Sequence, residues 1–433
     1  GEIYSGPIPV GRTMFIRAAA FKDGLLASPV NTHSYIFVDE VIAQPPDPPG
    51  WPGTWGVYLD FRPYQPPKGA PVPADYEMDP RITRHPEYSH VLKEGLQSIP
   101  TLSLVTEPKN FDIYVHALQR GLDWERPISV EWIDPANSDH EFQVYAGLRM
   151  QGVSARWECM PKKSFRLFFR CEYGTPRLKA PIFPDSQVDE FDTLVLRGGA
   201  NQGYAAFPSA MDYTRSTYTR DEWLRASQIA MSGVGSHGTF VHLYLNGLYW
   251  GLYNVVDRPD ADFAASYYGG QPEDWFAIKH GGTILNPNEV AQGAEPVIDI
   301  GEIIEGDDGR YEQLLALVEE GNLEDPVRYE QIKQLVDTRQ FSDYIILNLY
   351  AGNHDWGDNN WYITMRNDPP GPLRYFTWDG EVTWEDGAQL YMGKETPHHK
   401  MRPLFLALME NPDFRLEFAD RAALHLLNDG TLS

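Results

Sequence analysis

A loop with closely spaced aspartate and asparagine residues, followed at once by an aromatic hairpin, constrains this chain more than any other segment. Asp355 and Asn360 stand five positions apart in the loop. Two apolar and aromatic runs, Trp361–Arg366 and Leu373–Trp378, flank a turn-forming Asn-Asp-Pro-Pro-Gly-Pro segment, which predicts a pair of antiparallel strands. Asp379 follows the second run. The order places three polar side chains around one hairpin. An ordinary turn uses the same residue types, because the side chains of Asp and Asn form hydrogen bonds with their own backbone.

Phosphoryl transfer uses side chains of this kind. A carboxylate accepts the proton of the acceptor hydroxyl group, and further oxygen ligands hold Mg²⁺ on the phosphates of the nucleotide. Protein kinases have a loop Asp, an Asn five residues later, a short hairpin and a second, metal-binding Asp. The order in this chain is similar, and His354 precedes its Asp as a His does in the kinase loop. The similarity implies that Asp355 is the catalytic base and that Asn360 and Asp379 are metal ligands. Glu381 is a candidate additional ligand.

Further segments, taken together with this loop, resemble the CotH kinase-like family, atypical kinases named after a spore coat protein. They occur in one order between residues 98 and 433 and are Ile99–Val105, Gly121–Pro127, Ala146–Gly152, Pro161–Leu167, Leu196–Gln202, Tyr218–Asp221, Val241–Tyr253 and Trp378–Glu381. The resemblance implies an α+β, protein-kinase-like two-lobed fold over residues 98–433. It also implies transfer of the γ-phosphate of ATP, with Mg²⁺ or Mn²⁺, to a protein acceptor or other extracellular polymer.

The candidate nucleotide-binding residues lie near the end of a predicted antiparallel sheet. Its β-type runs include Ile128–Ile133, Phe142–Met150 and Ser164–Arg170. Lys162 and Lys163 enter the last run, where a kinase has the lysine that pairs with the α- and β-phosphates. Strand alternation places Lys162 and Arg166 on one face and Lys163 on the other. The resemblance favours Lys163, but periodicity does not choose between the two lysines, and basic residues also suit the solvated end of an edge strand.

A helix is predicted from Thr219 to Met231, with a Thr-Arg-Asp-Glu capping signal at its start. In a kinase, a helix behind the sheet supplies an acidic partner for the lysine, and Asp221 and Glu222 are the candidates here. Both are also the residue types that a helix N-terminus prefers, and we favour that structural role. Asp257 stands where the CotH-like family usually has Glu, so its side chain is shorter by one methylene group. The sequence does not identify the partner of this carboxylate.

The remaining elements follow from local signals. Asn246-Gly247 predicts a tight hairpin turn between two aromatic strands. Helical patterns follow at residues 311–320 and 337–350, and two further helices are expected at 403–409 and 412–427.

The first 97 residues differ in character from the rest. Residues 1–43 alternate like strands and resemble part of the chitobiase-type, fibronectin-III-associated repeat of secreted bacterial multidomain proteins, which implies a β-sandwich remnant; the alternative is a short hairpin that packs on the next domain. Residues 44–97 begin with a proline-dense stretch and are predicted to form a semi-rigid linker. Trp51 and Trp55 within it indicate docking against a domain surface.

Composition excludes several classes of partner. The net charge of -25 argues against nucleic acid or an anionic membrane as the main partner, because a phosphate backbone attracts Lys and Arg. No run of about 18 apolar residues occurs, so we expect no membrane span. The chain begins at Gly1 without an initiator Met, so we expect an upstream targeting segment and an extracellular or cell-surface location. The chain has only two cysteines, Cys159 and Cys171, and one pair does not identify the redox compartment.

Two other function classes compete with the kinase. One is a catalytically silent adhesion or matrix protein, whose 12 Trp and 24 Tyr residues would include exposed platforms for glycans. The other is a metal-dependent hydrolase built on acidic residues and one histidine, namely Asp355, Asp358, Asp379, Glu381 and His354.

Overall fold

The fold is taken from a computed structural model of the 433-residue chain. The structure describes residues 2–58, 67–158, 160–199, 216–279, 283–284, 297–298, 302–357, 359–384 and 401–433. The chain forms two compact units. Unit 1 comprises Gly1–Ala180, Leu196–Gly198 and Phe240–Val255, and unit 2 comprises Pro181–Val195, Gly199–Thr239 and Val256–Ser433. The predicted α+β class is confirmed.

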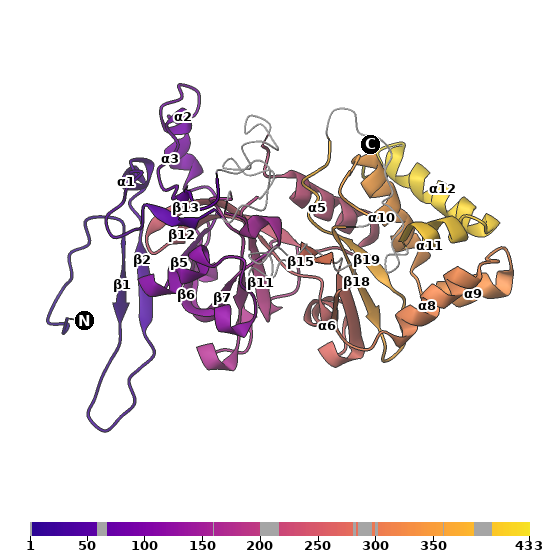
Figure 1. The fold of residues 1–433 in the computed structure, drawn as a ribbon, viewed down its shortest axis with the longest axis horizontal. Helices are drawn as coiled ribbons and strands as arrows, with labels where there is room; N and C mark the ends of the chain where they lie inside the picture. The colour runs from indigo at the N-terminus through magenta and orange to yellow at the C-terminus, as the bar shows by residue number, and fades with distance from the viewer. Residues whose placement is uncertain are drawn as a thin grey trace. The chain divides into compact units, whose positions relative to one another are not determined.

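Unit 1 is built on a closed seven-stranded barrel (Figure 1). Its strands, in the order in which they neighbour one another, are β11 (Thr193–Arg197), β13 (Leu248–Val256), β12 (Gly238–Leu245), β5 (Thr101–Val105), β6 (Arg126–Ile133), β7 (Phe142–Met150) and β8 (Phe165–Phe168). The antiparallel β6, β7 and β8 were expected, but closure of the sheet was not. Because a closed barrel has no edge strand, the interpretation of Lys162 and Lys163 as the solvated end of an edge is wrong.

The hairpin at Asn246-Gly247 forms as predicted. Both turn residues have positive backbone angles, with φ of 45° for Asn246 and 81° for Gly247, which is the conformation that two-residue hairpin turns require. β12 also pairs in parallel with β5, placing Leu243 opposite Leu102. This parallel pair joins segments more than a hundred residues apart.

Residues 1–43 supply one two-stranded sheet, β1 (Met14–Ala18) and β2 (Asn31–Tyr35), followed by α1 (Val38–Ile42). The backbone N–H of Ser34 donates to Oε2 of Glu131 on β6 at 2.7 Å, so this hairpin packs on the barrel. The observed contact agrees with the second interpretation of residues 1–43, a short hairpin that packs on the next domain. The resemblance to a sandwich repeat stays a prediction.

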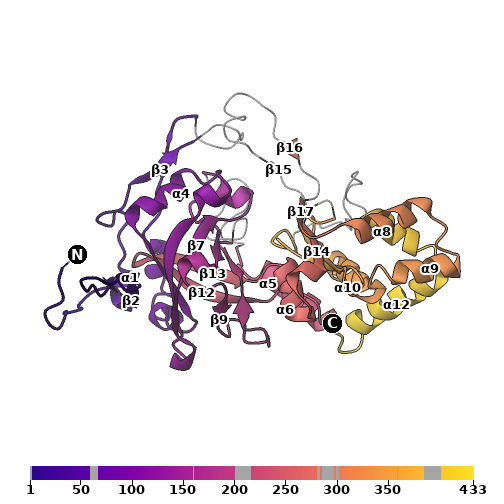
Figure 2. The ribbon, with the colours of Figure 1, turned by 90° about the horizontal axis from the view of Figure 1, so that it is seen from below.

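The proline-rich segment is docked on the barrel. It contains β3 (Thr54–Val57), β4 (Pro71–Pro73), α2 (Pro80–Thr83) and α3 (Leu92–Gly95), and α4 (Asp112–Val115) contacts both β3 and β7 (Figure 2). The ring centroids of Trp55 and Tyr114 lie 4.7 Å apart, and those of Trp51 and Trp250 lie 5.7 Å apart. The docking expected from Trp51 and Trp55 is therefore confirmed.

Unit 2 contains a four-stranded antiparallel sheet covered by helices. The strands, in spatial order, are β17 (Glu302–Glu305), β14 (Trp275–Lys279), β18 (Trp361–Arg366) and β19 (Arg374–Thr377). The helices are α5 (Arg220–Ser232), α6 (Ala261–Tyr268), α8 (Gly309–Glu320), α9 (Pro326–Lys333), α10 (Thr338–Tyr350), α11 (Met401–Leu408) and α12 (Pro412–Leu426). The β18–β19 hairpin and the helices predicted from local patterns are all confirmed.

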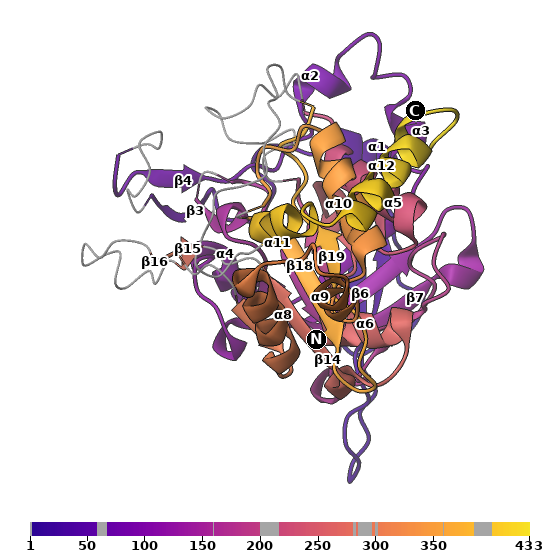
Figure 3. The ribbon, with the colours of Figure 1, turned by 90° about the vertical axis from the view of Figure 1, so that its right-hand side faces the viewer.

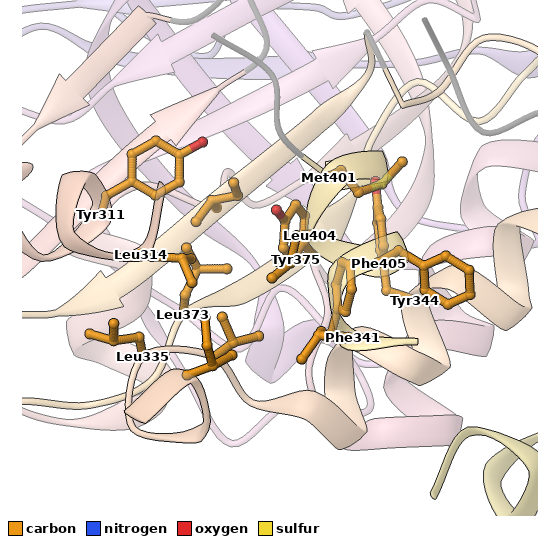
Figure 4. Close-up of a cluster of buried hydrophobic side chains, with 14 of the residues drawn as sticks. Tyr311, Leu314, Leu335, Phe341, Tyr344, Leu373, Tyr375, Met401, Leu404 and Phe405 are labelled. Carbon is orange, nitrogen blue, oxygen red and sulfur yellow. The ribbon is translucent and has the colours of Figure 1, made fainter. Parts of the chain in front are cut away.

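Helices of unit 2 pack on the sheet and on one another. α5 and α10 contact β19, α12 contacts α10, and α11 contacts α8 (Figure 3). The core between them includes Phe341 and Tyr344 of α10, Tyr375 of β19 and Leu404 of α11, which point toward one another (Figure 4). This core packs α10 against the hairpin, and the loop that contains Asp355 connects the two elements.

The remaining strands are short: β9 (Leu178–Lys179), β10 (Glu190–Phe191), β15 (Thr283–Ile284) and β16 (Val297–Ile298). In the part of the chain that the structure describes, no helix combines the length and the apolar character needed to cross a membrane. Cys171 has a free, exposed thiol, and Cys159 lies outside the described residues.

Candidate functional site

The loop after α10 is shaped by asparagine side chains. Nδ2 of Asn353 donates to Oδ1 of Asn348 at 2.9 Å, and Oδ1 of Asn353 accepts the backbone N–H of Asp355 at 3.1 Å. Asn353 is buried. These bonds give the polar groups of a tight loop partners inside the fold. They therefore set the direction in which the chain leaves α10 and the position of Asp355.

Asp355, Asn360 and Asp379 come together around the β18–β19 hairpin. Nδ2 of Asn360 donates to Oδ2 of Asp355 at 2.8 Å and lies 3.5 Å from the backbone oxygen of Asp379. Nδ2 of Asn359 donates to Oδ1 of Asp355 at 3.1 Å. Both oxygens of the Asp355 carboxylate thus accept an amide N–H, which fixes the orientation of the carboxylate.

The two expected metal ligands share an unusual backbone conformation. Asn360 has φ of 57° and Asp379 has φ of 54°, both in the left-handed region. Asn and Asp enter this region more easily than other residues that have a Cβ atom, but single residues held there concentrate at functional sites. Asn360 precedes β18 and Asp379 follows β19, so the two left-handed residues end the same hairpin.

The turn after Asp379 is held by α5. The backbone N–H of Gly380 donates to Oδ1 of Asp221 at 2.8 Å, and Oδ2 of Asp221 accepts Nε of Arg225 at 3.1 Å. Arg225 is fully buried and donates from Nη2 to Oε2 of Glu222 at 2.7 Å. A Cβ atom at Gly380 would lie 2.5 Å from Cδ2 of Leu224 on α5, which explains why glycine follows the aspartate.

The predicted capping box at the start of α5 is wrong. The helix does begin after Thr219, but the Thr219 side chain makes no capping hydrogen bond. Glu222, which would complete the box, pairs with Arg225 instead. Asp221 and Glu222 therefore have a structural role, as we favoured. They form ion pairs with the buried Arg225 and do not cap the helix through a capping box.

The chain beyond Asp379 runs beside the Asp355 loop. The backbone N–H of His354 donates to the oxygen of Val382 at 3.0 Å, and that of Trp384 donates to the oxygen of Ala351 at 3.0 Å. Glu381 lies in this segment and is buried. The fold therefore places Glu381 next to the loop, and its assignment as a further metal ligand stays a prediction.

The donor set fits a magnesium site completed by a ligand. Among the described residues, no three His, Cys, Asp or Glu side chains gather in a way that could hold a metal ion. Asp379 and Asn360 supply one carboxylate and one amide, and Mg²⁺ is commonly bound by one or two carboxylates together with substrate phosphates and water. The hydrolase alternative also requires Asp358, which lies outside the described residues.

Both candidate lysines of unit 1 are bound by backbone carbonyl groups. Nζ of Lys163, a buried residue, donates to the oxygens of Arg156, Trp157 and Met160 at 3.2, 2.7 and 3.2 Å. Nζ of Lys162 donates to the oxygen of Asp75 at 2.6 Å. Burial lowers the pKa of Lys162. Both amines thus form hydrogen bonds with the backbone of unit 1. That either amine also binds a nucleotide stays a prediction.

Arg166, the third candidate for the nucleotide, lies on β8 with its guanidinium carbon 4.7 Å from the ring centroid of Phe168. The sequence already suggested Arg170 beside Arg166 as a residue that a nucleotide site could use, whereas Arg149 reaches them only through the pairing of β7 with β8.

The partners of Asp257 are now assigned. Its carboxylate accepts Oγ of Ser236 at 2.8 Å, the backbone N–H of His237 at 2.8 Å and the hydroxyl of Tyr267 at 2.6 Å. Burial raises the pKa of Asp257 to about 6. The shorter side chain of Asp257 therefore accepts its hydrogen bonds from residues of unit 2.

Comparison with known proteins agrees with these features. The model of the family described as CotH kinase protein matches residues 148–429, more than half of the chain. Among curated proteins, none matches this chain. The matched region includes Asp355, Asn360 and Asp379, and on this match the chain belongs to the CotH kinase family.

Proposed function

We propose that this chain transfers the γ-phosphate of ATP to a hydroxyl group of a protein or other extracellular polymer, and that it acts outside the cell or at the cell surface. The observation that carries the proposal is the meeting of Asp355, Asn360 and Asp379 at the ends of one hairpin. The proposal includes a protein-kinase-like, two-lobed fold over residues 98–433.

Each residue has a distinct task. Asp355 accepts the proton of the acceptor hydroxyl, and its two amide donors keep the carboxylate directed while that proton moves. Asn360 and Asp379 hold Mg²⁺ or Mn²⁺, and Glu381 is a further candidate ligand. The metal ion, when bound, would neutralise negative charge on the β- and γ-phosphates. Lys162, Lys163 and Arg166 are the candidates that steady the phosphates.

The experiment measures binding and transfer separately. Calorimetry with ATP and Mg²⁺ or Mn²⁺ reports binding, and transfer of label from γ-labelled ATP to the chain or to a Ser-rich protein reports catalysis. Asp379→Ala should lose both metal-dependent ATP binding and transfer. Asp355→Asn should retain most of the ATP affinity and lose transfer by on the order of 10²-fold or more.

A matched control is Asp325→Asn. Asp325 accepts backbone N–H groups at the start of α9, a role that Asn fills equally well, so binding and transfer should equal those of the parent. If Asp355→Asn transfers phosphate at the parental rate, the assignment of the base is wrong.

The adhesion alternative has less support. Among the described tryptophans, only Trp384 is more than about a third exposed, at 46%. The other described tryptophan rings are therefore buried or half-buried and do not form broad exposed platforms for glycans. A parent chain that shows no transfer with either metal and binds a glycan tightly would establish the adhesion alternative instead.

A further inference from the structure

A hydrogen-bond network connects a buried carboxylate to the turn that follows β19. Asp257 is 3% exposed, and the backbone N–H of His237 donates to its Oδ1 at 2.8 Å. The backbone oxygen of His237 accepts Nη1 of Arg225 at 3.3 Å. Arg225 donates from Nε to Oδ2 of Asp221, whose Oδ1 accepts the N–H of Gly380. All five residues belong to unit 2, and we call this set the Asp257–Gly380 network.

The middle of the network is packed directly on α5. A Cβ atom at Gly235 would lie 3.2 Å from the backbone oxygen of Arg225. A Cβ atom at Gly238 would overlap Oε2 of Glu222 and lie 2.8 Å from Nη1 of Arg225. The two glycines thus bring the backbone on either side of His237 against the helix. Because the peptide group of His237 has so little space, a shift of this group must also move the Arg225 side chain.

A second chain of bonds leads from Asp257 toward the surface. Oγ of Ser186, a half-buried residue, donates to the hydroxyl of Tyr267 at 3.1 Å, and this hydroxyl donates to Oδ2 of Asp257 at 2.6 Å. Hydroxyl groups both donate and accept, so the chain can reverse when Oδ2 is protonated. Oδ1 accepts the hydroxyl of Ser236 and the N–H of His237 in either state. The two protonation states therefore keep their hydrogen bonds and differ in charge.

The charge of Asp257 acts on Arg225. Burial raises the pKa of Asp257 to about 6, and the charge of Arg225 is one of the influences that lower this pKa. Because such an interaction is reciprocal, the ionised carboxylate attracts the guanidinium group and the protonated carboxyl group does not. Arg258, the next residue in the chain, pairs with Asp260 and donates to the hydroxyl of Tyr362.

Other titratable groups face this carboxylate from α6 and from the segment before β12. Burial raises the pKa of Tyr267 and of Tyr268, and the charge of Asp257 raises both further, so both hydroxyls stay neutral. His237, when protonated, lowers the pKa of Asp257. Nδ1 of His237 lies 3.3 Å from Oδ1 of Asp185, which is 65% exposed, so solvent screens this pair. Asp257 is thus the buried group whose charge changes near neutral pH.

We propose that the Asp257–Gly380 network is a pH-sensitive control on the turn that carries Asp379. When ionised, Asp257 attracts Arg225 and so holds the turn firmly; when protonated, it holds the turn less firmly. The change falls between about pH 5 and pH 7. The effect on ATP rests on the proposed function: if Asp379 is a metal ligand, ATP binds with Mg²⁺ more tightly when Asp257 is ionised.

Hydrogen exchange of the Gly380 amide tests the control without ATP. Asp257→Asn keeps the shape of the side chain and removes its charge, so the protection of Gly380 should fall about fivefold at pH 7.5, the lower end of usual couplings between sites. At pH 5 the parental carboxyl group is neutral, and parent and variant should agree. The amide of Tyr375, which donates to Oε1 of Gln340 outside the network, is the reference. Its protection should not fall, because removing a buried charge stabilises the fold as a whole.

The matched control is Asp185→Asn. Asp185 also approaches His237, but at the exposed side of the ring and outside the network, so Gly380 should be protected as in the parent at both pH values. Unchanged protection of Gly380 in Asp257→Asn at pH 7.5 would show that the proposal is wrong. Should this variant not fold, the parent decides: the ratio of Gly380 to Tyr375 protection should rise about fivefold from pH 5 to pH 7.5, and a constant ratio would refute the control.

Calorimetry with ATP and Mg²⁺ distinguishes this inference from the proposed function. The affinity of the parent should exceed that of Asp257→Asn about fivefold at pH 7.5 and equal it at pH 5, and comparison at one pH removes the titration of ATP itself. Equal affinities at pH 7.5 together with altered Gly380 protection would overturn the effect on ATP. A parent that binds no ATP would contradict the proposed function alone, since Gly380 protection still decides whether Asp257 controls the turn.

Discussion

The link between α5 and the Asp379 turn predicts a large effect from a nearly isosteric change, Asp221→Asn. The Asp221 side chain is buried and accepts the Gly380 N–H and Nε of Arg225. In the variant the amide oxygen can still accept from Gly380, but the amide nitrogen then faces the buried guanidinium group. The substitution therefore preserves shape and removes one charge from a buried ion pair.

The magnitude follows from what remains around Arg225. Removing one partner of a buried pair costs about 3–5 kcal/mol, because the other charge is left without compensation. Arg225 keeps Glu222 and the backbone oxygen of His237, so we expect the lower end, about 3 kcal/mol. Asp221→Ala also loses the bond to Gly380 and should cost about 1 kcal/mol more.

Urea denaturation measures the effect. With an m-value of about 2–3 kcal/mol/M, the midpoint of Asp221→Asn should fall by about 1 M. Asp325→Asn is again the matched control, and its midpoint should not move. ATP binding with Mg²⁺ should weaken in Asp221→Asn even in the absence of urea, since the turn that positions Asp379 loses its anchor. An Asp221→Asn chain with the parental midpoint and parental ATP affinity would refute this reasoning.

Two further predictions concern pH and backbone conformation. The pKa of Asp257 rises to about 6 in the fold, from 3.8, so the folded chain holds this proton more tightly than the unfolded chain. The contribution of Asp257 to stability is thus most favourable below about pH 4 and declines by about 3 kcal/mol as pH rises to 6. The stability difference between the parent and Asp257→Asn, measured by urea denaturation from pH 4 to 7, should show this decline, and a flat difference would contradict it. Gly247→Ala should lower the free energy of unfolding by about 1 kcal/mol, because φ is 81° and the added methyl group meets only ordinary contacts. Gly53→Ala is the control, because a Cβ atom there has no neighbour within 4 Å. Equal urea midpoints for the two variants would show that the turn does not require glycine.

Local signals in the sequence predicted the helices of unit 2 and one hairpin in each unit. The hairpin between Trp361 and Trp378 formed because two aromatic runs flank a segment that cannot continue a strand. The Asn246-Gly247 turn formed because these residues tolerate positive φ. In both cases the interactions that decide the structure lie within a few residues of one another.

Long-range pairing could not be predicted in the same way. Closure of the barrel depends on β12 lying parallel to β5, a pair that no turn signal announces. The capping prediction at Thr219 failed for a similar reason. A buried arginine one turn into the helix competes for Glu222, and burial of Arg225 is set by the tertiary fold. Local rules identified the residues correctly but not their partners.

The candidate site shows the same division. The spacing of Asp355 and Asn360 was visible in the sequence, and the fold does bring them together. The contact of Asp221 with Gly380 depends on segments far apart in the chain. Sequence motifs therefore identify the residues proposed to do the chemistry, while the residues that position them appear only in the structure.

Helix α5 connects the stability of unit 2 to the geometry of the proposed site. Gln228 in its middle donates to the backbone oxygen of Tyr375 on β19, and Asp221 at its start accepts the N–H of Gly380. The helix thus bonds to the hairpin strand and to the turn that follows the strand. A displacement of α5 must therefore disturb the sheet and Asp379 together. Because Gly380 leaves no room for a side chain against Leu224, the turn has little freedom to adopt a second arrangement while α5 is in place. The position of Asp379 is consequently a property of the folded core of unit 2, and we expect variants that loosen α5 to lose metal-dependent binding and stability in parallel.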